Sequence, residues 1–296
     1  MRLLVRISAG ISLWSWGCGA GVTLPAEAIT LNQAGALALE QGDLETADAR
    51  LSLALEYSPK FVEALVNQGL VELQRGNFDR ARELIERARR LNPDVAQPHH
   101  ALGVLAERQA RPDVASQHYY EALAVDPGFA ASRANLARLL FDAGMLEQAL
   151  VQFKRLVEVS ANSPEPHVGL AETLLRLGRI DEAEAILGKA RERFADSEEL
   201  TVLAARSAMR VGDVERAVEL LSPLAYGMSD AAALALSWLA TAELLRGRPR
   251  AAIGAAKRAL KLDPRSRVAT YAMAQALEQL GDPGAFVWQR RLQQAL

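Results

Sequence analysis

Cysteine is almost absent from this sequence, and its absence excludes two ways of stabilising a fold. Cys18 is the only cysteine among the 296 residues. A single thiol cannot form an internal disulfide bond, and it cannot supply the several thiolates of a structural zinc site. We therefore expect the packing of apolar side chains to hold the fold together, and 50% of the residues are hydrophobic.

The sequence also lacks an excess of charge of either sign. Its 34 lysine and arginine residues nearly balance 36 aspartate and glutamate residues, which leaves a formal net charge of −2. A protein that binds nucleic acid or an anionic membrane surface through its charge usually carries a basic excess. We therefore expect no nucleic acid partner, and we expect membrane attachment only through a lipid anchor.

The short motifs of common catalytic and cofactor sites are absent as well. The sequence has no glycine-rich phosphate loop, no Gly-x-Ser-x-Gly elbow and no His-Glu-x-x-His motif. Its histidines show no spacing with acidic residues that would place three metal ligands on one face of a helix. The sequence thus predicts no metal, no cofactor and no enzymatic activity. We interpret His99 and His167 as packing residues, and His100 and His118 as solvent-exposed residues.

Residues 1–28 differ in composition from the rest of the chain. Two arginines, Arg2 and Arg6, precede twenty uncharged residues, and an Ala-Glu-Ala sequence ends at Ala28. A basic start, a short apolar stretch and small residues at a cleavage point are typical of a bacterial signal peptide. We therefore predict cleavage after Ala28 and export of residues 29–296 to the periplasm or outer membrane. The alternative is a cytoplasmic protein that keeps these residues.

Cys18 leaves two interpretations of this signal open. A lone cysteine at the end of an apolar stretch is the residue to which bacterial lipoproteins attach their lipid. The preceding Gly17 fits such a signal, whereas Ser15 and Trp16 do not. Cys18 is therefore either the site of a lipid anchor or a residue that is removed with the signal peptide.

A period of 34 residues runs through the remainder of the chain. Repeats begin near residues 28, 62, 96, 130, 164, 198, 233 and 267, with one extra residue between Tyr226 and Ala233. Glycine ends the first half of a repeat because it accepts a left-handed backbone turn. The fifteenth position is occupied by Gly42, Gly76, Ala110, Gly144, Gly178, Gly212, Gly247 and Gly281.

Within each repeat, the spacing of apolar residues predicts two helices. Apolar side chains recur every three or four residues, as at Leu51, Ala54 and Leu55, which is the period of an α-helix. Alanine recurs at the twentieth position, and a bulkier residue often follows four residues later. We therefore expect the bulky side chain (the knob) and the small residue whose space it fills (the hole) to lie on one helix. Second helices would be capped by the residues after the glycines: Asp43, Asn77, Asp213 and Asp282.

These positions resemble the tetratricopeptide repeat family, and the resemblance covers residues 28–296. It implies an all-α, right-handed superhelical solenoid of eight helix-turn-helix repeats. In that family the first helices line a concave groove that binds peptides. The resemblance therefore implies a non-catalytic scaffold with protein partners, which we expect in a bacterial envelope assembly such as a pilus, secretion or polysaccharide export apparatus. The alternatives are a scaffold that associates with itself as a homo-oligomer and a cytoplasmic adaptor.

The family's groove positions correspond to ten residues of this chain. Asparagine side chains there could bond a peptide backbone, arginines could bind a carboxylate, and the two aromatic rings could stack on an apolar side chain. The same side chains could instead be solvated surface residues. The ten are Asn32, Asn67, His100, Asn135, Arg138, Glu172, Arg206, Arg210, Trp238 and Tyr271.

Overall fold

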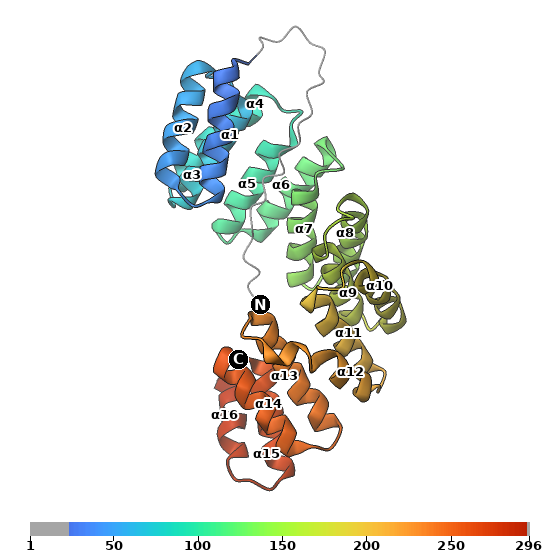
Figure 1. The fold of residues 1–296 in the computed structure, drawn as a ribbon. Helices are drawn as coiled ribbons and strands as arrows, with labels where there is room; N and C mark the ends of the chain where they lie inside the picture. Colours follow the sequence, from blue (N-terminus) through green and yellow to red (C-terminus); the bar gives the residue numbers. More distant parts are fainter. Residues whose placement is uncertain (1–23, 295–296) are drawn as a thin grey trace. The chain divides into compact units, whose positions relative to one another are not determined.

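The computed structural model describes residues 24–294, and the regular structure within that range is entirely helical. Sixteen α-helices and one short 3₁₀ helix follow one another along the chain (Figure 1). This confirms the predicted all-α repeat architecture. Among the described residues, no helix combines the length and the apolar character that crossing a membrane requires. The handedness of the superhelix stays a prediction.

The helices fall into two compact units that divide between Ala143 and Gly144. The division lies inside the fourth predicted repeat, between its two helices. The first unit contains α1 (Ala26–Glu40), α2 (Leu44–Tyr57), α3 (Val62–Gln74), α4 (Phe78–Leu91), α5 (Ala96–Arg108), α6 (Pro112–Val125) and α7 (Ala130–Asp142).

The second unit begins with α8 and continues to the end of the described residues. Each first helix, in both units, begins within three residues of the start that the 34-residue period predicts. The second unit contains α8 (Leu146–Val159), α9 (Glu165–Arg176), α10 (Ile180–Arg193), α11 (Glu198–Arg210), α12 (Val214–Leu221), the 3₁₀ helix η1 (Leu224–Tyr226), α13 (Asp230–Leu245), α14 (Pro249–Leu262), α15 (Arg267–Gln279) and α16 (Ala285–Gln294).

The fifteenth position of every repeat has the left-handed backbone that the sequence predicts. Its seven glycines have φ between +66° and +86°. In the third repeat this position is held by Ala110, which adopts φ +55° although it carries a Cβ. The repeat therefore imposes this turn even where glycine is missing.

Close packing within a repeat involves both of its helices, and here our interpretation from the sequence was wrong. A Cβ placed on Gly69 of α3 would lie 2.6 Å from Cγ1 of Ile85 on α4. The same overlap would occur between Gly103 of α5 and the buried ring of Tyr119 on α6. The small residue of the first helix is therefore the hole, and the bulky residue of the second helix is the knob.

Side-chain caps are present at only some of the predicted positions. Asp43 accepts a hydrogen bond from the Thr46 amide, and Asp213 accepts one from the Arg216 amide, each at 3.1 Å. Asn77 makes no such cap, and its side-chain nitrogen donates to Glu72 at 2.8 Å. The extra residue predicted after Tyr226 lies in the non-helical segment between η1 and α13, as expected.

The amino-terminal part of the described chain bears on the predicted signal peptide. Helix α1 begins at Ala26, and Ala28 is fully buried. The predicted cleavage point after Ala28 thus lies in the first turn of α1. Cys18 and most of residues 1–28 lie outside the described residues, so the signal peptide and its two interpretations stay predictions.

Candidate peptide-binding surface

The ten predicted groove residues all lie on first helices, and several of them join one repeat to the next. In the first unit, the side-chain amide of Asn67 on α3 donates to Oδ1 of Asn32 on α1 at 2.9 Å. Both side chains are half-buried. Because each amide keeps further hydrogen-bonding capacity, this pair could still bind a peptide backbone.

His100 of α5 is packed rather than exposed, which corrects our interpretation from the sequence. Its Nδ1 lies 3.0 Å from Oγ of Ser132 on α7. Its ring centroid lies 5.5 Å from that of Tyr119 and 5.4 Å from that of Phe129. Burial lowers the pKa of His100 to about 4, so the imidazole is neutral at physiological pH.

A polar network next to His100 connects α5, α6 and α7. The Tyr119 hydroxyl donates to Glu107 at 2.6 Å and accepts from the side-chain amide of Asn135 at 3.1 Å. Burial, followed by the negative charge of Glu107, raises the pKa of Tyr119. Arg138 pairs with Glu107 and also with Asp142. The guanidinium that we expected to bind a partner's carboxylate is therefore already paired within the protein.

In the second unit, three predicted groove residues form a ladder across α9, α11 and α13. Arg206 donates to Glu172 at 3.1 Å, and its guanidinium carbon lies 4.9 Å from the centroid of the Trp238 ring. Glu172 and Arg206 are 34 residues apart, so these two side chains occupy the same position in successive repeats. Arg210, one turn further along α11, is exposed.

The ladder leads to an apolar hollow of about 380 Å³ on the same unit. Trp238 and Tyr271 both contribute to its wall, and Tyr271 is 50% exposed. The repeat register predicted these two aromatic residues but not Leu292, which lies on the second helix α16 and therefore outside the first-helix positions. The apolar hollow is lined by Trp238, Thr241, Arg267, Val268, Tyr271 and Leu292.

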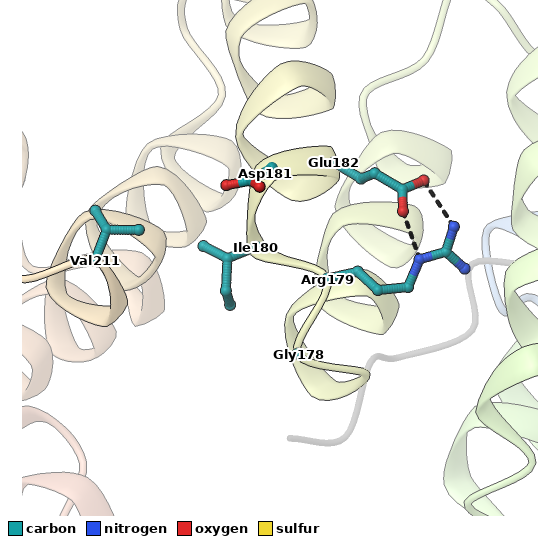
Figure 2. Close-up of a pocket in the computed structure, with 6 residues that line it drawn as sticks. All are labelled: Gly178, Arg179, Ile180, Asp181, Glu182 and Val211. Atoms are coloured by element: carbon teal, nitrogen blue, oxygen red, sulfur yellow. Dashed lines mark hydrogen bonds and ion pairs between the residues drawn. The ribbon is translucent and has the colours of Figure 1, made fainter.

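A second hollow lies at the turn between α9 and α10. Figure 2 shows that its cation, Arg179, faces Glu182, one of the two carboxylates that line it. The two are joined by paired hydrogen bonds of 2.5 and 2.7 Å. Because this guanidinium is already neutralised and no predicted groove residue lines the hollow, we assign it no binding role.

The structure thus divides the ten predicted residues among separate groups. In the first unit, Asn32 pairs with Asn67, while His100, Asn135 and Arg138 belong to the surroundings of Tyr119. In the second unit the predicted residues continue from the ladder to the apolar hollow. This hollow combines exposed aromatic surface with a nearby cation, which makes it the strongest candidate binding site in the described chain.

His118 is also not the solvent-exposed residue that we predicted. Its side chain is 21% exposed and approaches Glu121, which His99 of α5 approaches as well. Metal-ligand spacing along the sequence reveals only ligands that share one face of a single helix. His99, His118 and Glu121 come from two neighbouring helices, so the sequence did not predict that they meet.

Comparison with known proteins identifies related chains. The chain is 32% identical over 104 residues to the type IV pilus assembly protein PilF of Pseudomonas aeruginosa, a match that spans 35% of this chain and 40% of that relative. A tetratricopeptide repeat protein from Parabacteroides merdae superposes with a TM-score of 0.58 at 17% identity, over 86% of this chain and all (100%) of the other. PilW, a widely conserved type IV pilus biogenesis factor, superposes with a TM-score of 0.58 at 21% identity, over 70% of this chain and 97% of the other.

Three tetratricopeptide repeat models match successive parts of the sequence. One matches residues 61–128, a second matches 106–164 and 140–200, and a third matches 202–267 and 239–295. Together they extend from residue 61 to residue 295 apart from residue 201, which covers the second to the eighth of the repeats that the 34-residue period defines. The helix pairs, the glycine turns and these matches agree, and the chain belongs to the tetratricopeptide repeat family.

Proposed function

We propose that this protein is a non-catalytic scaffold that binds a partner polypeptide through the apolar hollow of its second unit. The observation that carries the proposal is the joint position of Trp238 and Tyr271 on neighbouring first helices. Large aromatic side chains in a partly desolvated hollow contribute strongly to protein binding, because they bury apolar area at little entropic cost. The likeness to the Pseudomonas aeruginosa pilus assembly protein supports a role in protein assembly.

The chemistry of the hollow favours a particular kind of partner segment. Val268 and Leu292 extend the apolar wall beside Tyr271, and exposed Arg267 adds a positive charge. Arg206 is held by Glu172 beneath the Trp238 ring, so it orients that ring rather than the partner. We infer that the segment carries an apolar side chain next to a carboxylate.

Photo-crosslinking in the native cell tests this proposal. A photoreactive phenylalanine analogue would replace Tyr271, and a matched control would replace Tyr120 on the second helix α6, where the tyrosine is 46% exposed. We expect an adduct with a distinct protein from the Tyr271 position and none from the Tyr120 position. Equal labelling at both positions, or none at either, would contradict the proposal.

We also propose that the scaffold works in the bacterial cell envelope. The signal-like composition of residues 1–28 and the likeness to PilF over 104 residues support this placement. Fractionation of native cells and amino-terminal analysis of the isolated protein test it. A mature chain that begins at Ile29 or at a lipid-modified Cys18 is expected, and the two results distinguish the two interpretations of the signal. A full-length cytoplasmic protein would refute export.

Self-association is a second candidate function, and the last helix favours it. Phe286 and Val287 of α16 are 68% and 65% exposed, which leaves adjacent apolar side chains on the surface of the described chain. Light scattering over a concentration series tests this candidate, with Phe286→Asp as the comparison. A species that stays monomeric at every concentration excludes it.

A further inference from the structure

Three side chains with metal-binding atoms converge between α5 and α6, away from the apolar hollow. Nδ1 of His99 on α5 lies 3.2 Å from Oε2 of Glu121 on α6, and Nδ1 of His118 lies 2.9 Å from the same oxygen. The three ligand atoms all lie within 4.8 Å of one another. Two imidazoles therefore point at one carboxylate oxygen.

These separations are close to those around a single metal ion. Zinc bonds imidazole nitrogen and carboxylate oxygen at about 2.0–2.2 Å, so two ligand atoms in a tetrahedral site lie roughly 3.3–3.5 Å apart. The observed distances of 2.9 and 3.2 Å are only slightly shorter. Small rotations of the side chains would open enough space for an ion among them.

The surroundings of the cluster hold the ligands in place. His118 and Glu121 are one helical turn apart and thus share a face of α6. Gln117 donates from Nε2 to the other oxygen of Glu121 at 3.2 Å, which orients the carboxylate. The side chain of His99 is 11% exposed and that of Glu121 is 33% exposed, so the cluster is partly desolvated but reachable from solvent.

We propose that His99, His118 and Glu121 bind one divalent transition-metal ion. Two imidazoles and a carboxylate match the ligand preferences of zinc and its neighbours in the first transition row, and disfavour Mg²⁺ or Ca²⁺. Three protein ligands leave a further coordination position for water or for a side chain of another molecule. The bound ion joins α5 to α6, and it does so independently of the peptide-binding role of the second unit.

Calorimetric titration with Zn²⁺ tests the proposal. The full-length, tag-free protein is first treated with a chelator to remove bound metal. We expect one saturable site per chain. His118→Ala and Glu121→Gln should each weaken the affinity at least about tenfold, because even the loss of a residue that only supports a ligand typically costs 10–100-fold. His167→Gln is the matched control, since His167 lies on α9 and bonds the Ser163 carbonyl. Cys18→Ser controls for binding by the thiol.

Visible spectroscopy with Co²⁺ keeps the test decisive if a variant fails to fold. The parent protein should show the intense absorption of four-coordinate cobalt, and excess Zn²⁺ should remove it. His99→Gln should lose this spectrum while circular dichroism reports an intact helical fold. The absence of a saturable site in the parent, or an unchanged affinity in the ligand variants, would show a purely hydrogen-bonded cluster and overturn the proposal.

Discussion

At the scale of single residues, the fifteenth repeat position requires a backbone that glycine adopts without strain. Seven glycines meet this requirement, and Ala110 adopts φ +55° in their place. A left-handed conformation costs a residue with a Cβ about 1–2 kcal/mol. The third repeat therefore stores strain at a turn where its neighbours have none.

Replacing Ala110 by glycine should relieve this strain. We expect Ala110→Gly to raise the free energy of unfolding by about 1 kcal/mol. Gly76→Ala in the preceding repeat is the reciprocal change. Gly76 has φ +82°, and a Cβ at this position would have no other atom within 4 Å. This change should lower the free energy by a similar amount. Urea unfolding followed by circular dichroism measures both, and effects of equal sign would contradict the account.

Glycine has a different role inside the first helices, where it makes room for a knob. Gly103→Ala should destabilise the protein by about 1–2 kcal/mol, because overpacking against the buried Tyr119 ring outweighs the better helix propensity of alanine. Gly188→Ala on α10 is the matched control, since a Cβ at this position would have no neighbouring atom within 4 Å. Thermal unfolding should show a stabilised control, and a stabilised Gly103→Ala would disprove the steric argument.

At the scale of helices, contacts between repeats depend on a few polar side chains in an otherwise apolar interface. Tyr119 is fully buried, and its hydroxyl joins Glu107 of α5 to Asn135 of α7. Removal of this hydroxyl takes a hydrogen bond from the Asn135 amide and from one oxygen of Glu107, while Arg138 still pairs with the other oxygen.

Tyr119→Phe should therefore lower the free energy of unfolding by about 1–2 kcal/mol. Tyr120→Phe, one residue along the same helix, alters an exposed side chain and should change stability by less than about 0.5 kcal/mol. Chemical denaturation of the two variants in parallel provides the comparison. Equal stabilities would show that the network contributes nothing measurable.

The repeat register predicted helices more accurately than contacts. Local chemistry sets the helix boundaries. A glycine turn such as that at Gly42, or a proline such as Pro59, ends a helix whatever that helix packs against. The pairing of His100 with Ser132, by contrast, depends on how two helices face each other across a repeat boundary. A period read along one chain contains no such information, and for the same reason the cluster around Glu121 was missed.

At the scale of the whole molecule, two units of stacked helix pairs offer different surfaces. In the first unit, the predicted groove residues Arg138 and His100 are engaged by neighbouring side chains. In the second unit, Trp238 and Tyr271 keep exposed ring surface beside Arg267. We therefore place partner binding on the second unit and metal binding on the first.

The central claim is that the apolar hollow binds a partner, and calorimetric titration measures it most directly. The protein would be titrated with the segment crosslinked from position 271, using the parent, Tyr271→Ala and the control Tyr120→Ala. We predict that Tyr271→Ala binds at least about tenfold more weakly, as expected when an aromatic anchor is lost, while Tyr120→Ala binds like the parent. Equal affinities for all three proteins would contradict the account.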